Sequence, residues 1–68
     1  MMIDPSKLHT GAVVIIAAFD EVPEHQFVIH TVEVDCVTGT ALTGPLAGSY
    51  GEPGLDLILG FHKDGLGS

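Results

Sequence analysis

Residues 11–20, GAVVIIAAFD, constrain the fold more than any other stretch of this sequence. Four consecutive β-branched residues, Val13 to Ile16, favour a strand. Ala17 and Ala18 keep a short helix open as the alternative, in an α+β fold. Successive side chains of a strand point to opposite faces, and here both faces are apolar. A strand of this kind must be covered on two sides.

A second subunit is the simplest second cover, because this 68-residue chain has no substantial helix to spare. At this size a chain buries only about 60% of its unfolded surface, so small domains often gain stability from disulfides, metals or self-association. Cys36 is the only cysteine, which excludes an intrachain disulfide, and we expect it to be a small buried thiol. The sequence therefore predicts a homo-oligomer, a dimer or tetramer, with these interface residues: Val14, Ile16, Ala18, Phe27 and Ile29.

Two later segments also have the character of strands. Residues 27–37 alternate from Val28 onward, with Val28, His30, Val32, Val34 and Cys36 expected to face the core. A turn at Thr38-Gly39 and a return strand over 40–43 would make residues 27–43 a hairpin. Residues 55–63 are expected to form the last strand. A helical turn capped by Asp4 is expected near the start, within an N-terminal segment 1–10, and residues 64–68 are expected to fray.

The predicted fold is all-β: one domain over residues 1–68, with four to five short strands in a strongly bent sheet or a barrel of SH3-like size. Gly39, Gly44 and Gly60 would serve the bends and bulges that such curvature needs.

The charge balance excludes several partners. Nine carboxylates stand against two lysines and no arginine, giving a formal charge of −7, so direct binding to nucleic acid is not expected. The longest apolar run, 12–19, is too short to cross a bilayer, and the N-terminus lacks the features of a secretory signal. These observations predict a cytoplasmic protein without membrane contact. An acidic decoy that docks on a basic nucleic-acid-binding protein is one alternative.

Residues 37–54, VTGTALTGPLAGSYGEPG, contain five glycines and two prolines. A phosphate-binding loop would lead into a helix and have a lysine or arginine nearby, and this stretch has neither. We expect a structured connection whose glycines allow positive φ. This connection either fills one end of the fold or lines the opening of a ligand-binding pocket. Leu46, Tyr50 and Glu52 are the residues it offers for binding.

The remaining polar residues give no catalytic set. His25 and His30 are five residues apart, which on one strand puts them on opposite faces, so no metal site is predicted and His30 is expected in the core or an interface. No serine or threonine has the sequence context of an activated nucleophile. Glu33 and Asp35 share a strand face and lack the glycine pattern of a calcium loop.

The sequence therefore favours a non-enzymatic β-barrel that acts as a homo-oligomer and binds a protein partner, without a cofactor. A small-molecule binder or minor enzyme, with its site at a subunit junction, is the other alternative. The site is expected at a junction because a pocket of roughly 300–1,000 Å³ is large for so short a chain. It would be formed by His30, Glu33, Asp35 and Tyr50.

Overall fold

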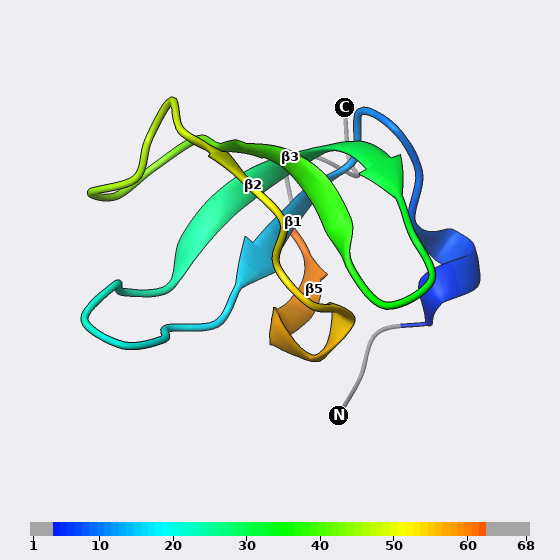
Figure 1. Ribbon diagram of the computed structural model, residues 1–68, viewed down its shortest axis with the longest axis horizontal. Coiled ribbons are helices and arrows are strands. Elements are labelled where there is room, and N and C mark those ends of the chain that lie inside the picture. The colour runs from blue at the N-terminus through cyan, green and yellow to red at the C-terminus, as the bar shows by residue number, and fades with distance from the viewer. Residues whose placement is uncertain (1–3, 63–68) are drawn as a thin grey trace.

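The computed structural model describes residues 4–62 and shows an all-β fold (Figure 1). Five antiparallel strands form one sheet, with one short 3₁₀ turn before the first strand and another before the last. The elements, in chain order, are η1 (Pro5–Lys7), β1 (Val13–Ile16), β2 (His25–Val32), β3 (Val37–Ala41), β4 (Tyr50–Gly51), η2 (Leu55–Leu57) and β5 (Ile58–Phe61).

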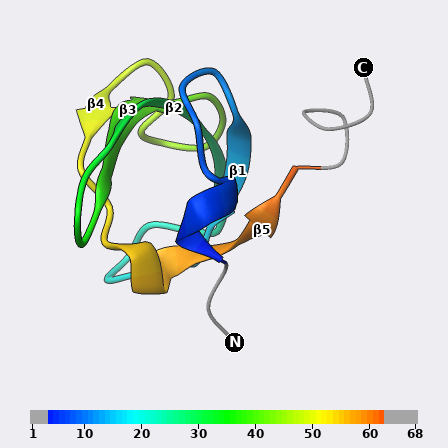
Figure 2. The ribbon, with the colours of Figure 1, turned by 90° about the vertical axis from the view of Figure 1, so that its right-hand side faces the viewer.

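The strands follow the order β4-β3-β2-β1-β5, so the chain runs as a meander from β1 to β4 and then returns to pair β5 with β1. The sheet bends strongly, and the gold turn η2 lies across from the middle of the arc (Figure 2). The two outermost strands, β4 and β5, are not paired with each other, so the described sheet is open at that point.

The N-terminal turn forms as its sequence indicates. The Asp4 carboxylate accepts hydrogen bonds from the backbone N–H of Ser6, at 3.0 Å, and from its hydroxyl, at 2.8 Å. These bonds hold the pKa of Asp4 below its usual value. Pro5 occupies the first position of the turn, where its missing N–H costs nothing. The turn leads directly to Leu8, which is buried in the core.

The strand interpretation of residues 11–20 is confirmed over β1. Burial alternates along β1, with Val14 and Ile16 fully buried and Val13 and Ile15 half-buried. Asp20 has a φ of 49°, and it turns the chain between Phe19 and Val22, which form an isolated bridge. The apolar run therefore ends in a tight turn rather than continuing as one long strand.

The predicted core face of the second strand is wrong. Phe27 and Ile29 are buried, while Val28 is half-buried and His30 is exposed. The first half of this segment is apolar on both faces, so alternation alone did not decide which face turns inward. A β-bulge at His30 then shifts the register, since Ile29 pairs with Gly39 and Thr31 pairs with Thr38.

The predicted turn of the hairpin is also misplaced. The chain reverses over residues 33–36, where the Glu33 N–H donates to the Cys36 carbonyl oxygen at 2.8 Å, and Thr38 and Gly39 lie within β3. Gly39 occupies a position where β3 lies very close to Val28 and Phe27 of β2. A Cβ at this position would collide with the Val28 carbonyl oxygen and lie 2.7 Å from Cε1 of Phe27. Glycine thus lets the Phe27 ring pack closely against β3.

The last predicted strand begins later than expected. Leu55 to Leu57 form η2, and β5 covers Ile58–Phe61, while Lys63 and the tail at 64–68 lie outside the described residues. Pairing between β1 and β5 contains a second bulge at Leu59, because Ile15 pairs with Gly60 and Ile16 pairs with Ile58.

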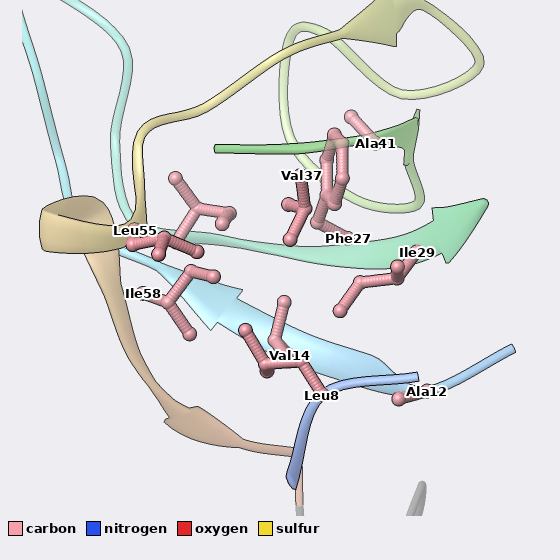
Figure 3. Close-up of a cluster of buried hydrophobic side chains, with 10 residues drawn as sticks. Leu8, Ala12, Val14, Phe27, Ile29, Val37, Ala41, Leu55 and Ile58 are labelled. Atoms are coloured by element: carbon pink, nitrogen blue, oxygen red, sulfur yellow. The ribbon is translucent and has the colours of Figure 1, made fainter. Parts of the chain in front are cut away.

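One apolar core lies inside the bend of the sheet (Figure 3). In this view Ile29 of β2 points toward Val14 of β1, and the Phe27 ring extends from β2 toward β3, beside Val37. Leu55 and Ile58 close the core from the other side. The buried apolar residues are Leu8, Ala12, Val14, Ile16, Phe27, Ile29, Val37, Ala41, Leu55 and Ile58.

Candidate functional site

A pocket of about 310 Å³ opens at one end of the core. Its apolar base is formed by Ile16, Phe19, Phe27, Ala41, Leu46 and Leu57. Its polar lining consists of His25, Ser49, Tyr50 and Glu52, and Gly51, Pro53 and Gly54 complete the wall. This volume lies at the lower end of the range for ligand pockets, and one chain forms it without a subunit junction.

The connection between β3 and β4 builds one wall of the pocket. Gly44 and Gly48 have φ values of 80° and 87°, which only glycine adopts without strain. Hydrogen bonds from Gly48 N–H to the Ala41 carbonyl oxygen, at 2.7 Å, and from Ser49 N–H to the Leu46 carbonyl oxygen, at 2.8 Å, fold the loop back on itself. This compact shape packs Leu46 against the core. The expected positive φ values in this stretch are confirmed at both glycines.

Tyr50 and Glu52 form the rim of the pocket. Tyr50 pairs with Thr40 at the sheet edge and is 63% exposed. Its hydroxyl donates a hydrogen bond to Oε2 of Glu52 at 2.8 Å. This bond, together with desolvation, raises the pKa of the Tyr50 phenol, so the hydroxyl stays protonated. The rim thus presents a fixed carboxylate beside an aromatic ring.

Cys36 lies near this rim but does not line the pocket. It is half-buried and forms an isolated bridge with Gly54. Desolvation raises the pKa of its thiol, and the Asp35 and Glu52 carboxylates add to the effect. A raised pKa keeps the sulfur as a thiol, which is a poor nucleophile.

The structure brings together three of the six predicted binding residues: Leu46, Tyr50 and Glu52 all line the pocket. The other three lie elsewhere. His30 is exposed at the bulge, with Nε2 3.4 Å from Oγ1 of Thr40. Glu33 and Asp35 are exposed at the turn after β2, where Glu33 accepts a hydrogen bond from the Thr31 hydroxyl at 3.1 Å.

Four of the predicted interface residues are core residues. Val14, Ile16, Phe27 and Ile29 are at most 2% exposed within the single chain, so their side chains have no surface to offer a second subunit. Both strands are apolar on two faces, and the bend of the sheet encloses the face that was expected to be outside. Ala18 is exposed, in the connection that follows β1.

Sequence reasoning missed His25, Phe19 and Leu57 as pocket residues. His25 is buried and belongs to the same face of β2 as Phe27 and Ile29, so its spacing could have identified it. Its acidic and proline neighbours made residues 20–26 resemble a loop. Phe19 and Leu57 reach the pocket from a turn and from η2, which no strand alternation reveals.

No three His, Cys, Asp or Glu side chains among residues 4–62 are grouped so that they could hold a metal ion. Within the same residues, no helix has the length and apolar character needed to span a membrane. Comparison of the chain with protein-family models, curated proteins and solved structures finds no match.

Proposed function

We propose that the protein is a non-enzymatic binding module that holds a protein partner at the pocket. The observation that carries this proposal is the pocket itself, with an apolar base and a polar, exposed rim of Ser49, Tyr50 and Glu52. Protein interfaces concentrate binding energy in such places, where an anchor side chain enters a desolvated pocket and a polar rim excludes water.

The charge of the site supports a neutral or basic partner surface. Glu52 is the only Asp, Glu, Lys or Arg among the residues that line the pocket. The whole chain has a formal charge of −7. The negative potential of the chain would repel an anionic ligand, and no basic side chain lines the pocket to compensate. A partner with arginine or lysine beside its anchor residue would instead be attracted by this potential.

We infer that the bent sheet is a half-open barrel of SH3-like size. The segment after β4 supports this description, because it crosses one end of the sheet. Val37 N–H donates to the Pro53 carbonyl oxygen at 3.0 Å, and Ala17 N–H donates to the Leu57 carbonyl oxygen at 2.7 Å. These bonds connect β3 and β1 through residues 53–57, and so narrow the gap between β4 and β5.

A matched pair of leucines in the loop after β3 tests the binding proposal. Leu46 lines the pocket, whereas Leu42 is 43% exposed and does not. Peptides selected from a random display library on the wild-type protein are expected to bind Leu46→Ala at least tenfold more weakly, because the anchor loses an apolar wall. Their affinity for Leu42→Ala should stay within about twofold of wild type. Isothermal titration calorimetry measures all three affinities.

Two results would contradict this proposal. Selected peptides that bind both variants as tightly as wild type would place the partner site elsewhere. A selection that yields no binder to the folded protein would argue against peptide recognition altogether. Thermal unfolding of Leu46→Ala serves as the control, since Leu46 also packs against the core and the variant must stay folded during titration.

We also propose that the chain self-associates through the outer face of β1 and β2. Val13 and Val28 lie opposite each other there, and Ile15 follows on the same face, so the cluster is continuous. All three side chains are half-buried rather than buried. Covering them would add apolar burial to a chain whose own core is small.

Light scattering after gel filtration tests this assembly. Wild type is expected to have the mass of a dimer or tetramer, and Ile15→Asp is expected to shift it to a monomer, because a carboxylate in an apolar contact is strongly unfavourable. Val34→Asp is the control, since Val34 is 96% exposed at the turn after β2 and its replacement should leave the mass unchanged. A wild-type monomer at every concentration would refute the assembly.

A further inference from the structure

His25 is the only buried polar side chain among residues 4–62, with 6% of its surface exposed. Its Nδ1 lies 2.9 Å from the carbonyl oxygen of Pro23. Because a carbonyl oxygen only accepts, Nδ1 must carry the hydrogen of this bond. In the neutral ring Nε2 is then the acceptor, with its lone pair directed away from Pro23.

This acceptor has no partner in the described part of the chain. Each fully buried side-chain nitrogen or oxygen there has a hydrogen-bond partner, so Nε2 of His25, for which the described residues supply none, keeps some surface that is open to water or a ligand. The space that His25 lines is the pocket. A ligand that fills the pocket would displace water from this acceptor, so it gains from supplying a donor of its own, because a dry and unpaired Nε2 would be costly.

The surroundings of Nε2 define the shape of that ligand. The Phe19 ring lies with its centroid 6.2 Å from the His25 ring, tilted by 56°, and Phe27 and Leu57 add further apolar wall. The pocket volume of about 310 Å³ is roughly twice that of a cavity of about 150 Å³ that binds benzene. A fused two-ring aromatic group therefore fits, and it needs one polar hydrogen.

We propose that the pocket binds a tryptophan side chain of the partner protein, with the indole N–H donating to Nε2 of His25. Indole is the one protein side chain that combines a fused aromatic ring with a donor and no acceptor. Tryptophan is also enriched among the anchors that dominate protein interfaces. This inference rests on the proposed function and names the anchor that the partner inserts.

Blocked amino acids test the inference directly on the wild-type protein. N-acetyl-tryptophanamide is titrated into ¹⁵N-labelled protein and compared with its 1-methylindole analogue, which lacks the N–H, and with N-acetyl-phenylalaninamide. The tryptophan derivative is expected to shift the backbone amide signals of residues 49–52 and of Gly54, and to move the Nε2 signal of His25 upfield. Methylation of the indole nitrogen should weaken binding by about fivefold or more.

His25→Phe provides the matched variant, because it keeps an aromatic ring and removes Nε2. In this variant the tryptophan derivative and its methylated analogue should bind equally. The variant also removes the bond to the Pro23 carbonyl oxygen, so its folding is checked by the dispersion of its amide spectrum. If it does not fold, the comparison of the two ligands on wild type still decides the question.

Several results would overturn the inference. Equal binding of the methylated and unmethylated ligands to wild type would show that Nε2 does not recognise the N–H. Tighter binding of the phenylalanine derivative, or no shift with any of the three, would exclude tryptophan as the anchor. Free indole binding at least tenfold more tightly than the blocked residue would assign the pocket to a small molecule. The comparison of Leu46→Ala with Leu42→Ala tests the partner site separately.

Discussion

Ile16→Asp is expected to abolish folding. Ile16 has no exposed surface and pairs with His25 on one side and Ile58 on the other. Removing a buried isoleucine side chain costs about 2–5 kcal/mol, and burying an unpaired carboxylate adds several more. A single core of this size rarely supplies more than about 3–5 kcal/mol. Circular dichroism and thermal unfolding should therefore show no cooperative transition.

Ile15→Asp is the matched control, since the same change is made one position away on the opposite face of β1. This variant should retain the fold, with a reduced midpoint, because Ile15 is only half-buried. A folded Ile16→Asp variant with a stability near that of wild type would mean that Ile16 lies outside the core. The sequence predicts Ile16 at a subunit interface, where Asp would dissociate the assembly, whereas its burial in the core makes loss of the fold the expected effect.

Gly39→Ala is expected to give the second largest effect. Its new methyl group would collide with the Val28 carbonyl oxygen and crowd the ring of Phe27. The carbonyl belongs to the neighbouring backbone, so relief requires β3 to move away from β2. Overpacking of this kind costs about 1–3 kcal/mol, which is a large share of the stability of so small a domain. A lower midpoint of urea unfolding, with an unchanged slope, is the expected measurement.

Gly60→Ala separates steric collision from a general effect of glycine replacement. Gly60 also lies in a strand beside a bulge, but a Cβ there would meet nothing within 4 Å. Its replacement should change the free energy of unfolding by no more than about 0.5 kcal/mol, or raise it slightly by restricting the unfolded chain. Equal losses in the two variants would contradict the close packing of β3 on Phe27.

Parts of the fold were predictable because they depend on local chemistry. The β-branched residues Val13 to Ile16 favour a strand whatever lies against them. Asp4 followed by Pro5 favours a capped helical turn in the same way. The all-β class and the range of strand numbers follow from the same kind of evidence. The sequence left a strongly bent sheet and a closed barrel as alternatives, and the described sheet is bent and open between β4 and β5 (Figure 2).

Other parts depend on tertiary packing and were not predictable. Phe27, Val28 and Ile29 are all apolar, so the inward face of β2 is decided by what β1 and η2 bring against it. From the bulge at His30 onward the alternation ends, because residues 30–32 are exposed on both faces of the strand. His30 was expected in the core or an interface and is exposed, whereas His25, expected in the connection before the strand, lies within β2 and is buried.

The candidate site was half predictable for a similar reason. Leu46, Tyr50 and Glu52 were identifiable because they are the large or charged side chains of a loop otherwise rich in glycine and proline. The base of the pocket comes from residues distant in sequence, such as Phe19 and Leu57, which meet only when the sheet bends. Nothing local in either segment indicates that encounter.

The order of the strands also determines how the chain reaches its native state. The β1–β2 and β2–β3 pairs join neighbouring segments, whereas β5 pairs with β1 from nearly the opposite end of the chain. Closing so long a loop carries the largest entropic cost, so we expect the central meander to form early and β5 to dock late. Leu57, immediately before β5, also walls the pocket. The binding site is therefore complete only after the slowest contact forms, and a bound partner would slow the first step of unfolding.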